Sequence, residues 1–125
     1  MRSEKKTGEP PQDIAERAFE FAVRVVKLCL TLDGSLGVSR TLANQLLRSG
    51  TSIGANLEES KGGQSRADYL TKVSISLKEA RETHFWLRLL VASEIIPENQ
   101  LAPLLDESSQ LIAILTTIVK KLKAH

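Results

Sequence analysis

The chain has 125 residues, of which 42% are hydrophobic and 26% are charged, so its length and composition suit one globular domain. Aromatic residues make up only 4%, which predicts a core of Leu, Ile, Val and Ala. The formal net charge of +2 permits an anionic partner, but dedicated nucleic-acid-binding domains are often more basic.

Cysteine content and hydropathy both indicate where the protein works. Cys29 is the single cysteine, so an intramolecular disulfide is excluded, which fits a reducing compartment. No stretch approaches the roughly 18 uncharged apolar residues of a membrane span, and the charged, proline-containing start of the chain does not resemble a signal peptide. We therefore expect a cytoplasmic protein.

The chain is predicted to begin with a tail, which a helical domain follows. Residues 1–12 contain Pro10 and Pro11, which prevent an early helix, and we interpret them as a flexible N-terminal tail. Asp13 is a good N-cap for the helix that follows. We predict that residues 13–125 form one domain.

Residues 14–32 have the apolar spacing of a helix with two neighbouring stripes. The first stripe contains Ile14, Ala18, Phe21, Val25, Leu28 and Leu32, and the second contains Ala15, Phe19, Ala22, Val26 and Cys29. One stripe would satisfy a single neighbouring helix, so two stripes predict contact with at least two neighbours. We interpret Cys29 as a small core residue, with a reactive thiol as the alternative.

Residues 39–61 predict a second helix, with Ser39 as a plausible N-cap. Gly50 and Gly54 lie on one face of it, and each costs roughly 1 kcal/mol of helix propensity relative to alanine. Close approach of another helix is the favoured explanation, and a local kink is the alternative.

Two longer helices follow. Ser65 is a good N-cap for residues 65–93, with Asp68 at the third helical position. After Pro97, the last helix carries a three–four apolar repeat. It begins either regularly at Pro103 or earlier, with one missing hydrogen bond. Short links between four helices predict an all-α, antiparallel up-down-up-down four-helix bundle. Wide apolar stripes also predict self-association.

Catalytic and metal-binding patterns are absent from the sequence. No glutamate lies three residues before His84, so the Glu-x-x-His pattern of di-iron bundles is missing, and no phosphate-loop motif occurs. No nucleophile has an evident partner histidine. We expect no enzyme activity, no metal and no cofactor.

Polar residues recur at helical spacing on the second and third helices. On one face we place Arg48, Ser52, Asn56 and Glu59, and opposite them Ser76 and Glu79. We interpret the six as an inter-helix polar network that sets register and partner choice, with a solvated face as the alternative.

Basic residues gather near two helix ends. Lys61 and Arg66 flank Gly62 and Gly63, and the C-terminal end contains Lys120, Lys121 and Lys123. These five are candidate phosphate contacts. The alternatives are a plain solvated turn and a purely structural interaction of the lysines with the helix dipole.

The middle of the chain resembles the four-helix bundle proteins related to those encoded in 23S ribosomal RNA intervening sequences. The resemblance covers RSGTSIGANLEES, then a glycine-rich turn, and then DYLTKVSISLKEARETHFWLRLL. The specific pieces are Ser52, Ile53, Asn56, Glu59, Ser76 and Glu79. The resemblance implies a bundle that assembles into a homopentamer. One related branch is the accessory variability protein of diversity-generating retroelements, which is basic, binds nucleic acid and partners a reverse transcriptase; this chain is less basic.

Two functions are compatible with these observations. We expect a non-enzymatic, oligomeric bundle that serves as a nucleic-acid or ribonucleoprotein accessory factor, with RNA or DNA as the partner. The alternative is a protein–protein adaptor or scaffold, such as a partner of a reverse transcriptase, that does not bind nucleic acid itself.

Overall fold

The computed structural model describes residues 13–32, 37–62 and 65–124, so the predicted tail 1–12 and Gly63 lie outside the described residues. Four α-helices follow one another: α1 (Ile14–Thr31), α2 (Val38–Ser60), α3 (Arg66–Ala92) and α4 (Glu98–Lys123). Strands do not occur in these three ranges. The all-α prediction is confirmed.

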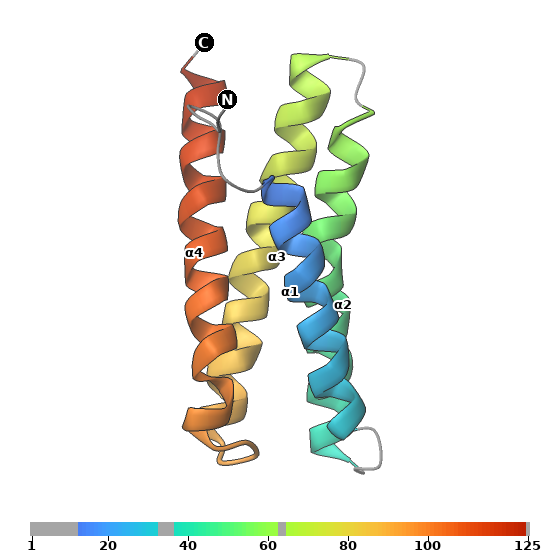
Figure 1. The fold of residues 1–125 in the computed structure, drawn as a ribbon, viewed down its shortest axis with the longest axis vertical. Helices are drawn as coiled ribbons and strands as arrows, with labels where there is room; N and C mark the ends of the chain where they lie inside the picture. The colour runs from blue at the N-terminus through green and yellow to red at the C-terminus, as the bar shows by residue number, and fades with distance from the viewer. Residues whose placement is uncertain (1–12, 33–36, 63–64, 125) are drawn as a thin grey trace, which may run out of the picture.

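Successive helices alternate in direction, as the colour gradient in Figure 1 shows. Each packs on the next along the chain, and α1 also contacts α4, although less extensively. The result is the predicted up-down-up-down bundle. The ends of α2 and α4 and the start of α3 therefore lie at one end of the molecule (Figure 1).

Helix starts follow local capping chemistry in two cases. The Asp13 carboxylate accepts a hydrogen bond from the Ala15 N–H at 3.0 Å, and the Ser65 hydroxyl accepts one from the Asp68 N–H at 3.1 Å. Both caps satisfy N–H groups that lack a partner within the helix. The two predicted caps are confirmed.

The predicted start of α2 differs from the structure, whereas α4 follows the second of its two predicted alternatives. Ser39 is not the cap of α2, because Gly37 occupies the N-cap position with φ of 67° and the helix already begins at Val38. Glycine reaches this backbone region without a steric penalty. Helix α4 begins at Glu98, before Pro103, so the helix continues with one backbone hydrogen bond missing, because proline has no N–H to donate.

The core is aliphatic with one phenylalanine, and it runs the length of the bundle. Its largest fully buried apolar side chains are Phe21, Leu46, Ile53, Leu87, Leu90, Leu101, Leu111 and Leu115. Gly54 lies against the backbone of α1, because a Cβ placed there would be 3.4 Å from the Ala18 carbonyl carbon. Close helix approach is therefore the role of this glycine.

Only the first stripe of α1 is consistently buried. Ala15 and Cys29 of the second stripe are also buried, but Phe19 is 61% exposed and Val26 is 39% exposed. The predicted contact of α1 with two neighbouring helices is confirmed, since α1 packs on α2 and α4, but part of the second stripe is exposed within one copy of the chain. The first stripe takes up the space between α1 and the other helices, so Phe19 and Val26 of the second stripe face outward.

Candidate functional site

The bundle topology gathers the five predicted phosphate contacts at one end. Lys61 follows the last residue of α2, Arg66 is the first residue of α3, and the three lysines lie in the last turn of α4. All five are exposed: Lys61, Arg66, Lys120, Lys121 and Lys123. Residues separated by about half of the sequence thus share one surface, which we call the basic end.

The five cations differ in how far other groups compensate them. Lys61 Nζ lies 3.4 Å from Asp13 Oδ2 and 3.5 Å from Glu58 Oε2. Hydrogen bonding to Asp13 raises the pKa of Lys61, so two carboxylates hold its charge. This lysine is the weakest candidate for a phosphate contact.

The other four cations lie around the C-terminus of α4. Arg66 Nη2 donates to the Leu122 carbonyl at 3.5 Å, which places its guanidinium beside carbonyls that lack a helical partner. Lys120, Lys121 and Lys123 form no ion pair with any residue in the described ranges. They interact favourably with the helix dipole and still present their ammonium groups to solvent.

Contacts between α2 and α3 include part of the predicted polar network. Arg48 Nη1 lies 3.4 Å from Glu79 Oε1, and Arg48 also pairs with Glu82. Lys72 Nζ donates to Glu59 Oε1 at 2.6 Å. At least one side chain of each pair is exposed, and exposed ion pairs contribute only about 0–1 kcal/mol each.

Buried hydrogen bonds connect the same two helices more firmly. The Ser76 hydroxyl donates to the Ile53 carbonyl at 2.7 Å. The hydroxyl oxygens of Ser49 and Thr83 are 3.0 Å apart, and both side chains are fully buried. Since a buried polar group costs free energy when unpaired, these contacts favour one register of α2 against α3.

Ser52 and Asn56 bond within their own helix instead. Ser52 Oγ donates to the Arg48 carbonyl at 2.7 Å, and Asn56 Nδ2 donates to the Ser52 carbonyl at 2.9 Å. Ser49 and Thr83 are the buried pair that the sequence analysis did not assign. The sequence does contain a signal for Thr83, because it continues the helical spacing of Val73, Ser76 and Ala80 on one face of α3.

Groups with catalytic potential include a histidine–serine contact that the sequence did not predict. Ser108 is buried, and its hydroxyl oxygen lies 2.9 Å from the Leu105 carbonyl oxygen and 2.8 Å from His84 Nδ1. Burial and then Arg88 lower the pKa of His84. Burial raises the pKa of the Cys29 thiol, which disfavours the thiolate. The described residues contain no cluster of three or more His, Cys, Asp or Glu side chains suited to a metal.

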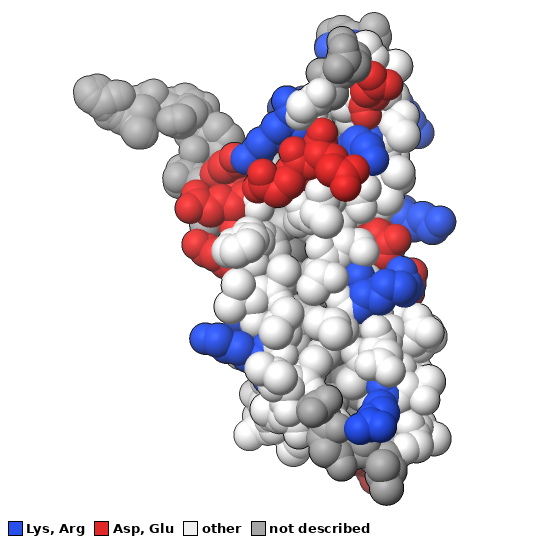
Figure 2. Space-filling view, turned by 90° about the vertical axis from the view of Figure 1, so that its right-hand side faces the viewer, with Lys and Arg blue, Asp and Glu red and all other residues white. Residues whose placement is uncertain are grey.

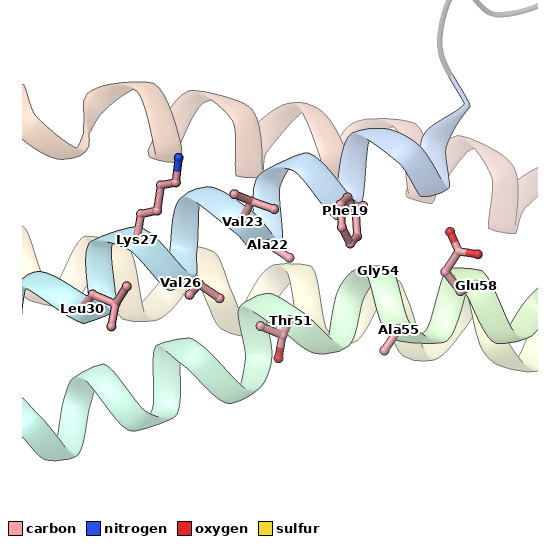
Figure 3. A pocket seen from close by; sticks show the side chains of 10 residues that line it. All are labelled: Phe19, Ala22, Val23, Val26, Lys27, Leu30, Thr51, Gly54, Ala55 and Glu58. Atoms are coloured by element: carbon pink, nitrogen blue, oxygen red, sulfur yellow. The ribbon is translucent and has the colours of Figure 1, made fainter. Parts of the chain in front are cut away.

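An open apolar groove runs between α1 and α2 on the side of the molecule away from α4. It has a volume of about 610 Å³, and Figure 3 shows its lining: Phe19, Ala22, Val23, Val26, Lys27, Leu30, Thr51, Gly54, Ala55 and Glu58. Apart from Lys27, Thr51 and Glu58, these residues carry no polar side chain. We call this feature the α1–α2 groove.

Fold and surface together define a small helical-bundle protein with a basic end and an exposed apolar groove. A family model described as 23S rRNA-intervening sequence protein matches residues 11–117. The chain belongs to this family.

A solved structure gives the same result. The chain is 41% identical to a protein of unknown function from the S23 ribosomal protein family of Bacteroides thetaiotaomicron. The match covers 86% of this chain and 99% of that one, with a TM-score of 0.80. A comparison with curated proteins finds no match. None of the helices, as far as the structure describes them, is long and apolar enough to cross a membrane.

Proposed function

We propose that this chain is a non-enzymatic, homo-oligomeric bundle that binds RNA or DNA through its basic end as an accessory factor. The observation that carries the proposal is the gathering of Arg66, Lys120, Lys121 and Lys123 around the end of α4. The family description, which refers to ribosomal RNA, supports the same class of partner. A cytoplasmic location belongs to the proposal.

Self-association is part of this function, because one copy presents only a few uncompensated cations. A symmetric assembly repeats the basic end, and clustered charge raises the local potential seen by a phosphate backbone. The family resemblance leads us to expect five copies. Burial of Ser108, and burial of Cys29 with its raised thiol pKa, support a binding role without catalysis.

A salt series tests nucleic-acid binding. Affinity for a structured RNA and for duplex DNA is measured by fluorescence anisotropy, and we expect it to fall steeply with salt because binding releases counterions. Replacing Lys121 and Lys123 with glutamine should weaken binding and reduce the logarithmic salt slope by about 2 on duplex DNA.

A charge-matched control separates this site from general electrostatics. Lys78→Gln with Arg81→Gln removes the same charge from exposed positions in the middle of α3 and should leave affinity and slope nearly unchanged. Equal losses in both double variants, or no binding at low salt, would refute the proposed interface.

The second candidate is a protein–protein adaptor that does not contact nucleic acid, such as one that binds a reverse transcriptase. The α1–α2 groove favours it, since exposed apolar surface is typical of protein interfaces. In the same salt series the adaptor predicts an intact oligomer that binds neither nucleic acid.

A further inference from the structure

The wall of the α1–α2 groove is an unpartnered ridge on α1. Phe19, Val23, Val26 and Leu30 follow four–three–four spacing and therefore lie on one face of the helix. Their exposed fractions are 61%, 38%, 39% and 66%. Large aliphatic and aromatic side chains at this exposure leave a continuous apolar strip in water, so covering the strip would be favourable.

The groove also has a charge at each end. Glu58 lies near one end and Lys27 near the other, as Figure 3 shows. Figure 2 shows this side of the molecule, with acidic residues mainly in its upper part, Lys and Arg in both parts, and a largely uncharged surface between them. Glu58 also lies 3.5 Å from Lys61 Nζ in an exposed pair, whereas Lys27 forms no ion pair within the described ranges. A surface that covers the groove should therefore carry a carboxylate near Lys27, and a cation on it can join the Glu58–Lys61 pair.

The outer face of α4 has these properties. Residues at helical spacing form an exposed strip, which we call the α4 face: Ala102, Asp106, Ser109, Ala113, Thr117 and Lys120. Four of the six are small, so the face can approach a ridge of larger side chains closely. Asp106 and Lys120 are its two charges; the Asp106 carboxylate accepts from Gln110, and Lys120 forms no ion pair within the described ranges.

The charges on the two surfaces lie at matching heights along the bundle. Contacts between the four helices define one level along the bundle. Ser108 bonds His84, and neighbouring Thr83 bonds Ser49. Gly50, which is adjacent to Ser49, packs on Val25. Asp106 and Lys27 lie two positions from this level, both toward the same end of the molecule.

Glu58 and Lys120 lie on the opposite side of that level. At 1.5 Å per residue they rise about 14 Å and about 18 Å above it. The difference of roughly one helical turn is within reach of a lysine side chain.

We propose that the α1–α2 groove of one copy docks against the α4 face of a second copy in the same orientation. Lys27 then faces Asp106 of the next copy, and Glu58 faces Lys120. The contact uses two different surfaces, so each copy offers one of each and successive copies can close into a ring. This inference rests on the self-association in the proposed function and assigns the surfaces that produce it. Lys120 then belongs to this contact, and Arg66, Lys121 and Lys123 remain at the basic end, beyond the contact, as its phosphate contacts.

A mixing experiment tests the pairing of two different surfaces. Val26→Arg blocks the groove, and Ala113→Arg blocks the α4 face; both positions are exposed, so the bundle should remain folded by circular dichroism. We expect each variant alone to be monomeric by light scattering, because each lacks one surface. An equimolar mixture should give a species of twice the monomer mass, joined through the one intact pair.

Charge reversal tests the register. Lys27→Glu and Asp106→Lys should each weaken assembly, about fivefold in dissociation constant per contact, and the chain with both changes should recover. Lys78→Glu, at an exposed position on α3, is the matched control and should assemble normally.

Three results would overturn the inference. Assembly of the Ala113→Arg chain alone would indicate a groove-to-groove contact. A mixture that stays monomeric would show that the two surfaces do not pair. A wild-type chain that is monomeric at high concentration would assign the groove to a different protein. Failure of nucleic-acid binding would leave the measured mass unchanged, so the two proposals fail independently.

Discussion

At the residue scale, the two buried glycines of α2 have different surroundings. A Cβ at Gly50 would lie 2.9 Å from Val25 Cγ1, whereas one at Gly54 would lie no closer than 3.4 Å to any neighbour outside its own helix. Val25 is fully buried and β-branched, so it has few alternative rotamers with which to make room. The same chemical change should therefore have different effects at the two positions.

We predict that Gly50→Ala lowers the free energy of unfolding by about 1 kcal/mol, because overpacking of about 1–3 kcal/mol exceeds the roughly 1 kcal/mol gain in helix propensity. Gly54→Ala keeps the propensity gain at ordinary contact distance and should be neutral or stabilising. Urea denaturation of both variants measures the difference. Equal destabilisation of the two would show that α1 approaches α2 equally closely along its whole length.

At the element scale, helix ends show how local chemistry decides where an element begins. Ser65 caps α3 through the Asp68 N–H, while Ser39 lies inside the first turn of α2 after Gly37. The two serines look alike in the sequence. They differ because the positive φ of Gly37 already starts α2 before Ser39.

We predict that Ser65→Ala lowers the free energy of unfolding by about 1 kcal/mol, since the Asp68 N–H loses its partner. Ser39→Ala is the matched control and should cost only a few tenths of that amount, because Ser39 occupies no cap position. Thermal unfolding followed by circular dichroism compares them. A larger loss at Ser39 would contradict the observed start of α2.

At the scale of the whole molecule, the two proposed interfaces have different physical origins. The basic end relies on exposed charge, which salt screens, whereas the α1–α2 groove contributes mainly apolar burial. Raising the ionic strength from about 0.05 M to about 0.5 M should release nucleic acid while the oligomer persists. Light scattering and anisotropy on the same samples check this, and dissociation into monomers at the higher salt would show that charge dominates the assembly.

Local patterns in the sequence were sufficient for the helices themselves. The apolar spacing, the caps at Asp13 and Ser65, and the short links predicted four antiparallel helices, and the structure contains them. These signals work because helical periodicity and capping depend on residues within one or two turns of each other. The family resemblance depended on the same local motifs of α2 and α3.

The tertiary structure alone decided how each helix is rotated and which distant residues meet. It turned Phe19 outward while burying Phe21, directed Ser52 and Asn56 back to their own helix, and brought Arg66 to the Leu122 carbonyl. Two apolar stripes on α1 are nearly equivalent in the sequence, and only packing against α2 and α4 selects one. The sequence therefore determined the elements, and long-range packing determined the surfaces they present.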